Sequence, residues 1–107
     1  MARWNSWMAP YRVAMSPLAS EESLVAGMAS SDPGVRAWTA VNPRANEAVW
    51  VLAARDPDVF VRRGLAEHLA QRARMHRPVP VQVLEYLRND EDERVSELAQ
   101  RALYWVR

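Results

Sequence analysis

An internal repeat limits the fold of this chain more than any other feature of its sequence. Residues 16–36 align with residues 42–62 without a gap, and seven of the 21 positions are identical. A third, weaker copy follows at an offset of 34 from the second, once the segment before it is lengthened by eight residues. Repeats of this length are typical of chains whose units are small groups of secondary-structure elements stacked on one another.

Each copy predicts a first helix that starts at a capping residue. Ser16 and Asn42 are each followed by proline, which the first turn of a helix accepts because the missing N–H has no partner there. Ser20 and Asn46, four residues further on, match in chemistry and can also cap a helix. Only about ten residues separate these caps from the next turn, so we expect some first helices to be short or of 3₁₀ type.

An acidic turn follows the first helix in every copy, and a second helix follows the turn. Proline interrupts helix propagation in the first two turns, and aspartate side chains are expected to cap the helix that comes next. In the last copy, apolar residues recur at i, i+3, i+4 and i+7 and predict an amphipathic helix. The turns are residues 31–34, 56–58 and 89–92, and the second helices are expected to start near Val35, Val61 and Val95.

These patterns predict one all-α domain over residues 1–107. No run alternates apolar and polar side chains over five or more residues with β-branched enrichment, and no Asn-Gly or Asp-Gly pair marks a hairpin. We expect about six helices in stacked pairs, because a single pair cannot bury its apolar face alone. Residues 1–15, which include Trp4 and Trp7, are expected to form an aromatic N-terminal cap. The repeats are expected to span about 16–41, 42–75 and 76–107.

The alignment also predicts where single residues lie. Trp38 aligns with Gly64 and Leu98, and Trp50 aligns with Leu84. These are core positions, so both tryptophans are expected in the core, and Gly64 is expected where another backbone approaches closely. Trp105, near the other end of the chain, is expected to cap the stack in the same way as the N-terminal tryptophans.

The segment from Asp32 to Pro43 reads DPGVRAWTAVNP and is similar to HEAT-like helical repeats, most of all to the leucine-rich repeat variant. Val61 to His68 resembles the second helix of that family, and the resemblance covers residues 16–107. It implies a short right-handed α-solenoid of about three helical pairs. The third copy departs from the pattern, because Ser96 stands at the arginine position and the preceding helix is longer. The iron–sulfur cluster of some family members does not transfer, because the chain has no cysteine.

Composition and motifs favour a protein without catalysis, cofactor or metal. The absence of cysteine removes thiolate nucleophiles and thiolate-ligated metals. The two histidines, His68 and His76, are eight residues apart, which is about 12 Å along a helix and too far to share one metal. No HExxH, GxSxG or glycine-rich phosphate loop occurs. We therefore expect a non-enzymatic protein.

No segment of the sequence is apolar over the roughly 20 residues that a membrane span needs. The first fifteen residues also lack the continuous apolar stretch of a secretory signal. A cytoplasmic location is therefore expected.

The predicted function is binding of a protein partner through the exposed face of the stacked second helices. Arg36 and Arg62 occupy equivalent positions and have two interpretations: a basic ladder for binding, or pairing with aspartates of neighbouring turns such as Asp32, Asp56 and Asp58. Arg63 can pair with Glu67 one turn later or contact the partner. The expected contact residues are Arg36, Arg62, Arg63, Glu67, Glu97 and Gln100.

Charge leaves two further partners open. All fourteen basic residues are arginine, and the net charge is +1. Residues 33–77 carry eight arginines and four acids, whereas residues 78–107 carry four arginines and six acids. This asymmetry favours self-association of oppositely charged ends. The alternative is binding of a nucleic-acid backbone in an arginine-lined concave face, although the sequence pI of about 8.3 lies below the value above about 9 typical of such domains.

Overall fold

The computed structural model describes residues 9–106, and within this range the chain forms seven α-helices and no β-strand. The all-α prediction is therefore confirmed for the described residues. One helix more than expected is present, because residues 9–15 of the predicted N-terminal cap form a helix of their own. The helices are α1 (Ala9–Met15), α2 (Glu21–Met28), α3 (Pro33–Ala40), α4 (Glu47–Ala54), α5 (Val59–Arg74), α6 (Val81–Leu87) and α7 (Glu93–Val106).

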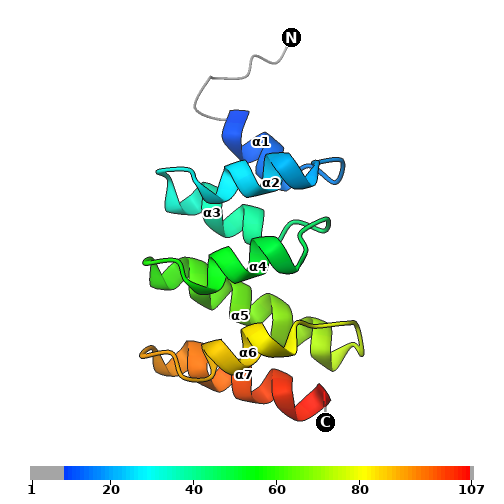
Figure 1. Cartoon of the computed structure of the whole chain (residues 1–107), viewed down its shortest axis with the longest axis vertical. Helices are drawn as coiled ribbons and strands as arrows, with labels where there is room; N and C mark the ends of the chain where they lie inside the picture. Colours follow the sequence, from blue (N-terminus) through cyan, green and yellow to red (C-terminus); the bar gives the residue numbers. More distant parts are fainter. Residues whose placement is uncertain (1–8, 107) are drawn as a thin grey trace.

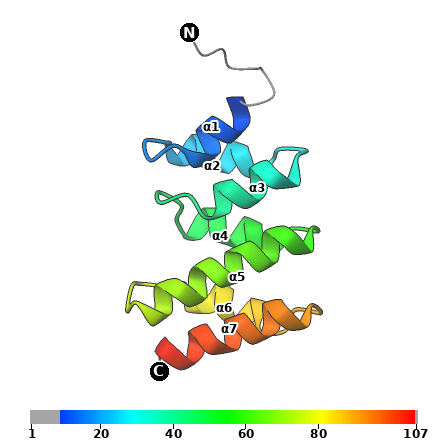
Figure 2. The same cartoon turned by 180° about the vertical axis from the view of Figure 1, so that it is seen from behind.

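The helices form two layers along the long axis of the molecule (Figures 1 and 2). Helices α1, α3, α5 and α7 follow one another in one layer, and each contacts the next. Helices α2, α4 and α6 do the same in the other layer, and every helix also contacts its sequence neighbour across the layers. The chain thus zigzags between the layers, and helices α1 and α7 lie at opposite ends of a body that measures 49 × 26 × 22 Å.

The first helices start four residues later than the prolines predict. Ser20 caps α2 and Asn46 caps α4, each by accepting a hydrogen bond from the backbone N–H three residues on. The prediction that helices start at Ser16 and Asn42 is wrong. Helices α2, α4 and α6 are seven or eight residues long, as expected, but all three are α-helices and not 3₁₀-helices.

Asn42 has a structural task that explains why it does not cap a helix. Its side chain is buried, and its Nδ2 donates hydrogen bonds to the backbone carbonyls of Ala14 and Ser16. Its Oδ1 accepts a hydrogen bond from the backbone N–H of Arg44 at 2.8 Å. Asn42 therefore ties the turn after α3 to the turn after α1, and the proline beside it lies in this turn.

The three acidic turns share one local structure, and they confirm that aspartates cap the second helices. At one position, a side-chain oxygen accepts a hydrogen bond of 2.8–3.1 Å from the backbone N–H two residues on. Two positions later, a carboxylate accepts a hydrogen bond of 2.8–3.0 Å from the first turn of the next helix. The residues at the first position are Ser30, Asp56 and Asp90, and those at the second are Asp32, Asp58 and Asp92.

The core lies between the two layers and between successive helices of each layer. The second helices start two residues earlier than predicted. Their three aligned valines, Val35, Val61 and Val95, are 2%, 0% and 0% exposed. Leu65 and Leu69 on α5 are fully buried as well, since α3 and α7 flank this helix. The predicted register is thus confirmed at its central positions.

Two of the predictions for tryptophan positions have opposite outcomes. Trp50 is in the core, and its indole N–H donates a hydrogen bond to the carbonyl of Ala40 at 3.1 Å. Trp38 is 49% exposed, so its placement in the core is wrong. The equivalent residue Leu98 is buried because α5 packs over it, whereas α1 covers α3 less completely. Trp4 and Trp7 lie outside the described residues.

The expectation of a close backbone contact at Gly64 is also wrong. A Cβ atom at Gly64 would meet no atom within 4 Å. The close approach is at Gly27 on α2, where a Cβ atom would lie 2.6 Å from Oγ1 of Thr39 on α3. Thr39 is fully buried, and its hydroxyl donates a hydrogen bond to the carbonyl of Val35, so it has no room to move.

Helix α5 is eight residues longer than α3, which accounts for the longer spacing before the third copy. Helix α5 ends at Arg74 and is capped by Met75, and the next residue, His76, adopts a left-handed conformation with φ 58°. The N–H of His76 bonds to the carbonyl of Ala73, and the N–H of Arg77 bonds to the carbonyl of Arg72. This pair of hydrogen bonds is a Schellman motif, which satisfies carbonyls at the end of the helix.

We expect Leu65→Ala to lower the free energy of unfolding by about 2–5 kcal/mol, because it removes a fully buried side chain and leaves a cavity between α5 and its neighbours. Urea unfolding followed by circular dichroism measures this change. A value near zero would contradict the packing of α5 described above.

Two of the helical glycines, Gly27 and Gly64, should respond in opposite directions to alanine. Gly64→Ala should raise the free energy of unfolding by about 0.5–1 kcal/mol, because the new methyl group meets open space and alanine favours helix. Gly27→Ala should lower it, because the methyl group overlaps the immobile Thr39, and overpacking of this kind costs about 1–3 kcal/mol. Urea unfolding of both variants checks the pair, and equal effects would contradict it.

Candidate binding surface

Arg36, a predicted contact residue, forms an ion pair between two successive turns. Its Nε lies 2.7 Å from Oδ2 of Asp56, and its Nη2 donates to Oδ1 of the same carboxylate at 3.2 Å. Its Nη1 donates to the carbonyl of Ser30 in its own turn at 2.8 Å. The paired carboxylate raises the pKa of Arg36. The guanidinium group thus binds both the turn before α3 and the turn after α4.

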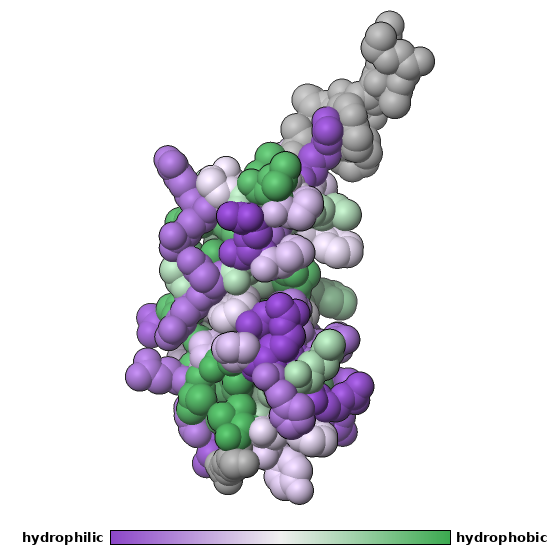
Figure 3. All heavy atoms as spheres, turned by 90° about the vertical axis from the view of Figure 1, so that its right-hand side faces the viewer, coloured by the Kyte–Doolittle hydropathy of each residue, from purple (hydrophilic) through white to green (hydrophobic). Residues whose placement is uncertain are grey.

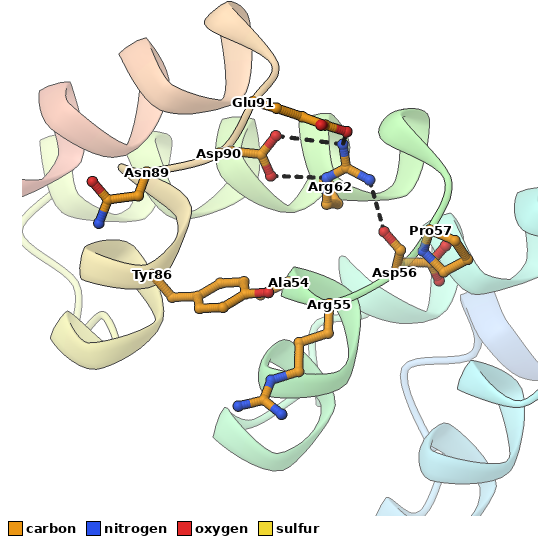
Figure 4. Close-up of a pocket in the computed structure, with 9 residues that line it drawn as sticks. All are labelled: Ala54, Arg55, Asp56, Pro57, Arg62, Tyr86, Asn89, Asp90 and Glu91. Carbon is orange, nitrogen blue, oxygen red and sulfur yellow. Dashed lines mark hydrogen bonds and ion pairs between the residues drawn. The ribbon is translucent and has the colours of Figure 1, made fainter.

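Arg62 repeats this arrangement one unit further along the stack (Figure 4). Its Nε lies 2.8 Å from Oδ2 of Asp90, and its Nη1 donates to the backbone carbonyl of Asp56 at 2.8 Å. A second carboxylate, that of the exposed Glu91, lies 3.9 Å from Nη2. Both arginine side chains are at most 15% exposed, and their aspartate partners are at most 7% exposed. We call the two pairs Arg36–Asp56 and Arg62–Asp90 the arginine ladder.

The ladder has a different residue at each end. The first turn carries Ser30 where the later turns carry the paired aspartates. Helix α7 carries Ser96 at the arginine position, and its hydroxyl donates to the carbonyl of Arg88 at 2.7 Å. A half-buried charge is costly unless it is paired, so the arginines occur where a carboxylate of the next turn can meet them.

Arg63 has a partner that its sequence neighbours do not reveal. Its Nη2 lies 2.6 Å from Oδ1 of Asp92, and its Nε donates to Oδ2 of the same carboxylate at 3.0 Å. Glu67, the i+4 residue expected to pair with it, forms no ion pair with Arg63 among the described residues. Asp92 also caps α7, and the hydrogen bond from Arg63, followed by that from the N–H of Val95, lowers the pKa of Asp92 from 3.8 to about 2.

The six predicted contact residues therefore do not form one uniform surface. Three of them are the arginines held by aspartates, and the other three are exposed. Glu67 lies on α5, Glu97 and Gln100 lie on α7, and the amide of Gln100 donates to the hydroxyl of Ser96 at 3.1 Å. Arg36 and Arg62 pair with aspartates of neighbouring turns, the second interpretation given for them, although the partner of Arg62 is Asp90 and not one of the aspartates named for it. The partner of Arg63, Asp92, is one that the sequence did not indicate.

A cavity of about 490 Å³ opens between α5 and α7, which we call the α5–α7 groove. Residues from α5 form one wall at a spacing of i, i+3, i+4 and i+7, and residues from α7 form the other wall at i, i+3 and i+7. Leu98 lies at the base of the groove and is only 5% exposed, Ala70 is partly buried, and Trp105, which is 43% exposed, supplies most of the apolar surface. The residues that line the groove are Glu67, Ala70, Gln71, Arg74, Leu98, Arg101 and Trp105.

The sequence identified only Glu67 among these lining residues as a contact residue. Arg74, Arg101 and Trp105 become visible as a group only when α5 and α7 lie side by side, because 27 residues separate the two arginines along the chain. A signal was present in the helical spacing of each wall, but neither wall by itself differs from the exposed face of an ordinary helix.

The end of this layer also exposes apolar side chains. Met75 is 59% exposed, Val106 is 43% exposed, and the ring of Trp105 lies 6.3 Å from that of His76 in an edge-on arrangement. Figure 3, which views the right-hand side of Figure 1, shows apolar surface near the lower end of the molecule. The partial exposure of Trp105 leaves its ring accessible from the groove, and its predicted role as a cap of the stack stays a prediction.

A second cavity, of about 540 Å³, lies between the turns that hold Arg62 (Figure 4). Its one wall is the ladder pair Arg62–Asp90, and its other wall carries Arg55 and Tyr86. The guanidinium carbon of Arg55 lies 5.6 Å from the centre of the Tyr86 ring, a cation–π distance. The polar groups of each wall thus contact one another: Arg62 contacts Asp90 on one wall, and Arg55 contacts Tyr86 on the other.

The two histidines, His68 and His76, lie in different surroundings. His68 packs against Trp50 with 6.4 Å between ring centres, and burial lowers the pKa of His68, an effect to which nearby arginines add. His76 lies at the end of α5. Within residues 9–106, no group of three or more acidic or histidine side chains is placed to hold a metal ion. No helix in this range has the length and apolar character that crossing a membrane requires.

Comparison of the chain with models of protein families, with curated proteins and with solved structures finds no match.

Stability should depend on acid through the pair Arg63–Asp92. The pKa of Asp92 is lower in the folded chain than its ordinary value of 3.8, so its stabilising contribution is complete above about pH 4. That contribution is lost as the pH falls toward 2. Arg63→Gln should lower stability at pH 5 and should flatten the decline between pH 4 and pH 2, because the pKa of Asp92 returns toward 3.8.

Urea midpoints of the wild type and the variant at pH 5, 4, 3 and 2 measure this difference. Arg94→Gln, at an exposed position of α7, serves as the control and should keep the wild-type profile. An unchanged slope in Arg63→Gln would show that the pair does not govern the acid response.

Proposed function

We propose that this chain is a non-enzymatic module that binds a protein partner, built as a short right-handed α-solenoid of about three HEAT-like helical pairs, closest to the leucine-rich repeat variant. Two layers of helices and a turn structure that recurs three times support the solenoid. Within such a stack each unit buries its apolar side against the next, and the outer faces are left for contacts.

The proposed contact surface is the α5–α7 groove, and the observation that carries the proposal is its lining. The arginines of the ladder and Arg63 are engaged by aspartates, whereas Arg74, Arg101 and the half-exposed Trp105 face one cavity. Arginine and tryptophan are the side chains that most often dominate the binding energy of protein interfaces. The groove thus brings both kinds of side chain together.

Rigidity of both walls supports binding at this place. Leu65 and Leu69 hold α5 in the core, and Arg63 clamps the N-terminus of α7 to α5 through Asp92. Side chains on helices fixed in this way lose little conformational entropy when a partner binds, so more of the contact energy appears as affinity.

The alternative of nucleic-acid binding has less support. It relied on an arginine-lined face, and Arg36, Arg62 and Arg63 each have a carboxylate within 2.8 Å that neutralises the charge. Phosphate binding needs cations that are free to replace counterions. The absence of catalysis, the cytoplasmic location and self-association stay predictions.

Filling the groove should abolish capture of the partner. We expect Gln71→Trp, which places a large ring between the walls, to fold normally because Gln71 is exposed, and to lose the protein that the wild type retains from an extract of its own host. Gln82→Trp makes the same change at an exposed position of α6 and should retain that protein. Affinity capture followed by mass spectrometry compares the three chains.

The proposal requires capture that depends on the groove. Retention of the same protein by Gln71→Trp, equal loss in Gln82→Trp, or capture of nucleic acid alone would each overturn it. Circular dichroism melts of both variants show that the comparison is made between folded chains.

A further inference from the structure

We propose that the α5–α7 groove binds an acidic peptide segment, with a carboxylate received by Arg74 and Arg101 and an apolar side chain resting on Trp105. This inference rests on the proposed function and names the chemistry of the partner. Both arginines line the same cavity of about 490 Å³, one from each wall.

The first argument is that these two arginines are unpaired within residues 9–106 and line the same cavity. Six other arginines of the described residues are engaged by carboxylates, by a backbone carbonyl or by an aromatic ring, and the exposed Arg44, Arg77 and Arg94 do not line the groove. Arg74 and Arg101 have no hydrogen bond, ion pair or ring contact with any described residue, and both side chains are exposed. The engaged arginines are Arg36, Arg62, Arg63 and Arg88 with carboxylates, Arg72 with the carbonyl of Pro78 and the Trp50 ring, and Arg55 with Tyr86.

The second argument is the chemistry of the guanidinium group. Its planar arrangement of N–H donors matches a carboxylate, and such charge-assisted hydrogen bonds are stronger than neutral ones. The arginine ladder shows the same geometry inside this chain, where Arg62 holds Asp90 through Nε and Nη2. Arg74 and Arg101 carry the same donors without an acceptor in the described part of the protein, so a carboxylate of a ligand can take the place that Asp90 takes beside Arg62.

The third argument is the surface around the arginines, which selects a peptide over a bare anion. The α7 wall reads Leu98, Arg101 and Trp105, each about one helical turn from the next. Arg101 thus lies between an aliphatic and an aromatic side chain. Leu98 is buried at the base of the groove, so an apolar neighbour of a carboxylate at Arg101 would lie against the exposed ring of Trp105, with Ala70 on the facing wall.

The charges that line the groove favour a negatively charged ligand. Glu67 is the one acid among the seven lining residues, against two arginines. An acidic segment is attracted by this balance, and a basic segment is repelled. Removal of the Glu67 charge should therefore strengthen binding of the correct ligand, whereas removal of either arginine should weaken it.

The test uses three fluorescein-labelled peptides that differ only in charge. Each has leucines in a glycine–serine background, with glutamate, glutamine or arginine at the same remaining positions. Fluorescence anisotropy with the full chain should show binding of the glutamate peptide and weaker or no binding of the other two. Arg74→Gln and Arg101→Gln should each weaken it about five- to tenfold, and Glu67→Gln should tighten it.

Arg94→Gln is the matched control, because Arg94 is exposed on α7 but does not line the groove. Its affinity should equal that of the wild type. An equal loss in this variant would show attraction by net charge alone and would overturn the inference, as would tighter binding of a DNA duplex than of the glutamate peptide.

The outcomes separate this inference from the proposed function. Equal binding of the glutamine peptide, lost in Gln71→Trp, would overturn the acidic ligand and leave the groove as a protein-binding surface. Failure of all three peptides to bind would also overturn the acidic ligand. The proposed function itself is overturned only by the capture experiment with Gln71→Trp and Gln82→Trp.

Discussion

Burial of apolar side chains between successive helix pairs is the constraint on which the rest of this molecule depends. A pair of short helices, such as α2 and α3 with eight residues each, has too little surface to bury its own apolar face. Stacking on the next pair removes Val35, Val61 and Val95 from water, and these side chains are at most 2% exposed. The elongated shape follows, because each unit can be covered only by the units before and after it.

The arginine ladder adds direction to this stacking. Burial of apolar side chains depends only weakly on a small shift of one helix pair against the next. A bidentate contact between guanidinium and carboxylate, in contrast, needs one distance and one orientation. Arg36 and Arg62 each bind the carbonyl of the turn before their own helix and the aspartate of the turn that follows the next helix. The ladder therefore fixes the spacing of adjacent turns, and it removes from solvent the arginines that the sequence offered as a binding surface.

The candidate site could be predicted only in part, because it lies between helices that are distant in sequence. The alignment indicated that the second helices present an outer face, and Glu67 belongs to the groove on that face. The alignment could not distinguish an arginine that pairs with Asp90 from an arginine that lines a cavity, because both lie outside the apolar stripe of their helix. The predicted close contact at Gly64 is wrong for the same reason: a glycine in the sequence shows that a side chain is absent, but not whether another helix fills the space.

The sequence by itself determined the local order of this protein: helix, acidic turn and helix, with aspartates as caps and valines inside, because capping and helical periodicity act over a few residues. Tertiary structure alone decided which charges are satisfied. Arg63 pairs with Asp92 across 29 positions rather than with Glu67 one turn away, and Arg74 and Arg101 remain without an acceptor in the described chain. Partners of this kind depend on the distance between stacked helices, which spacing along the chain does not contain.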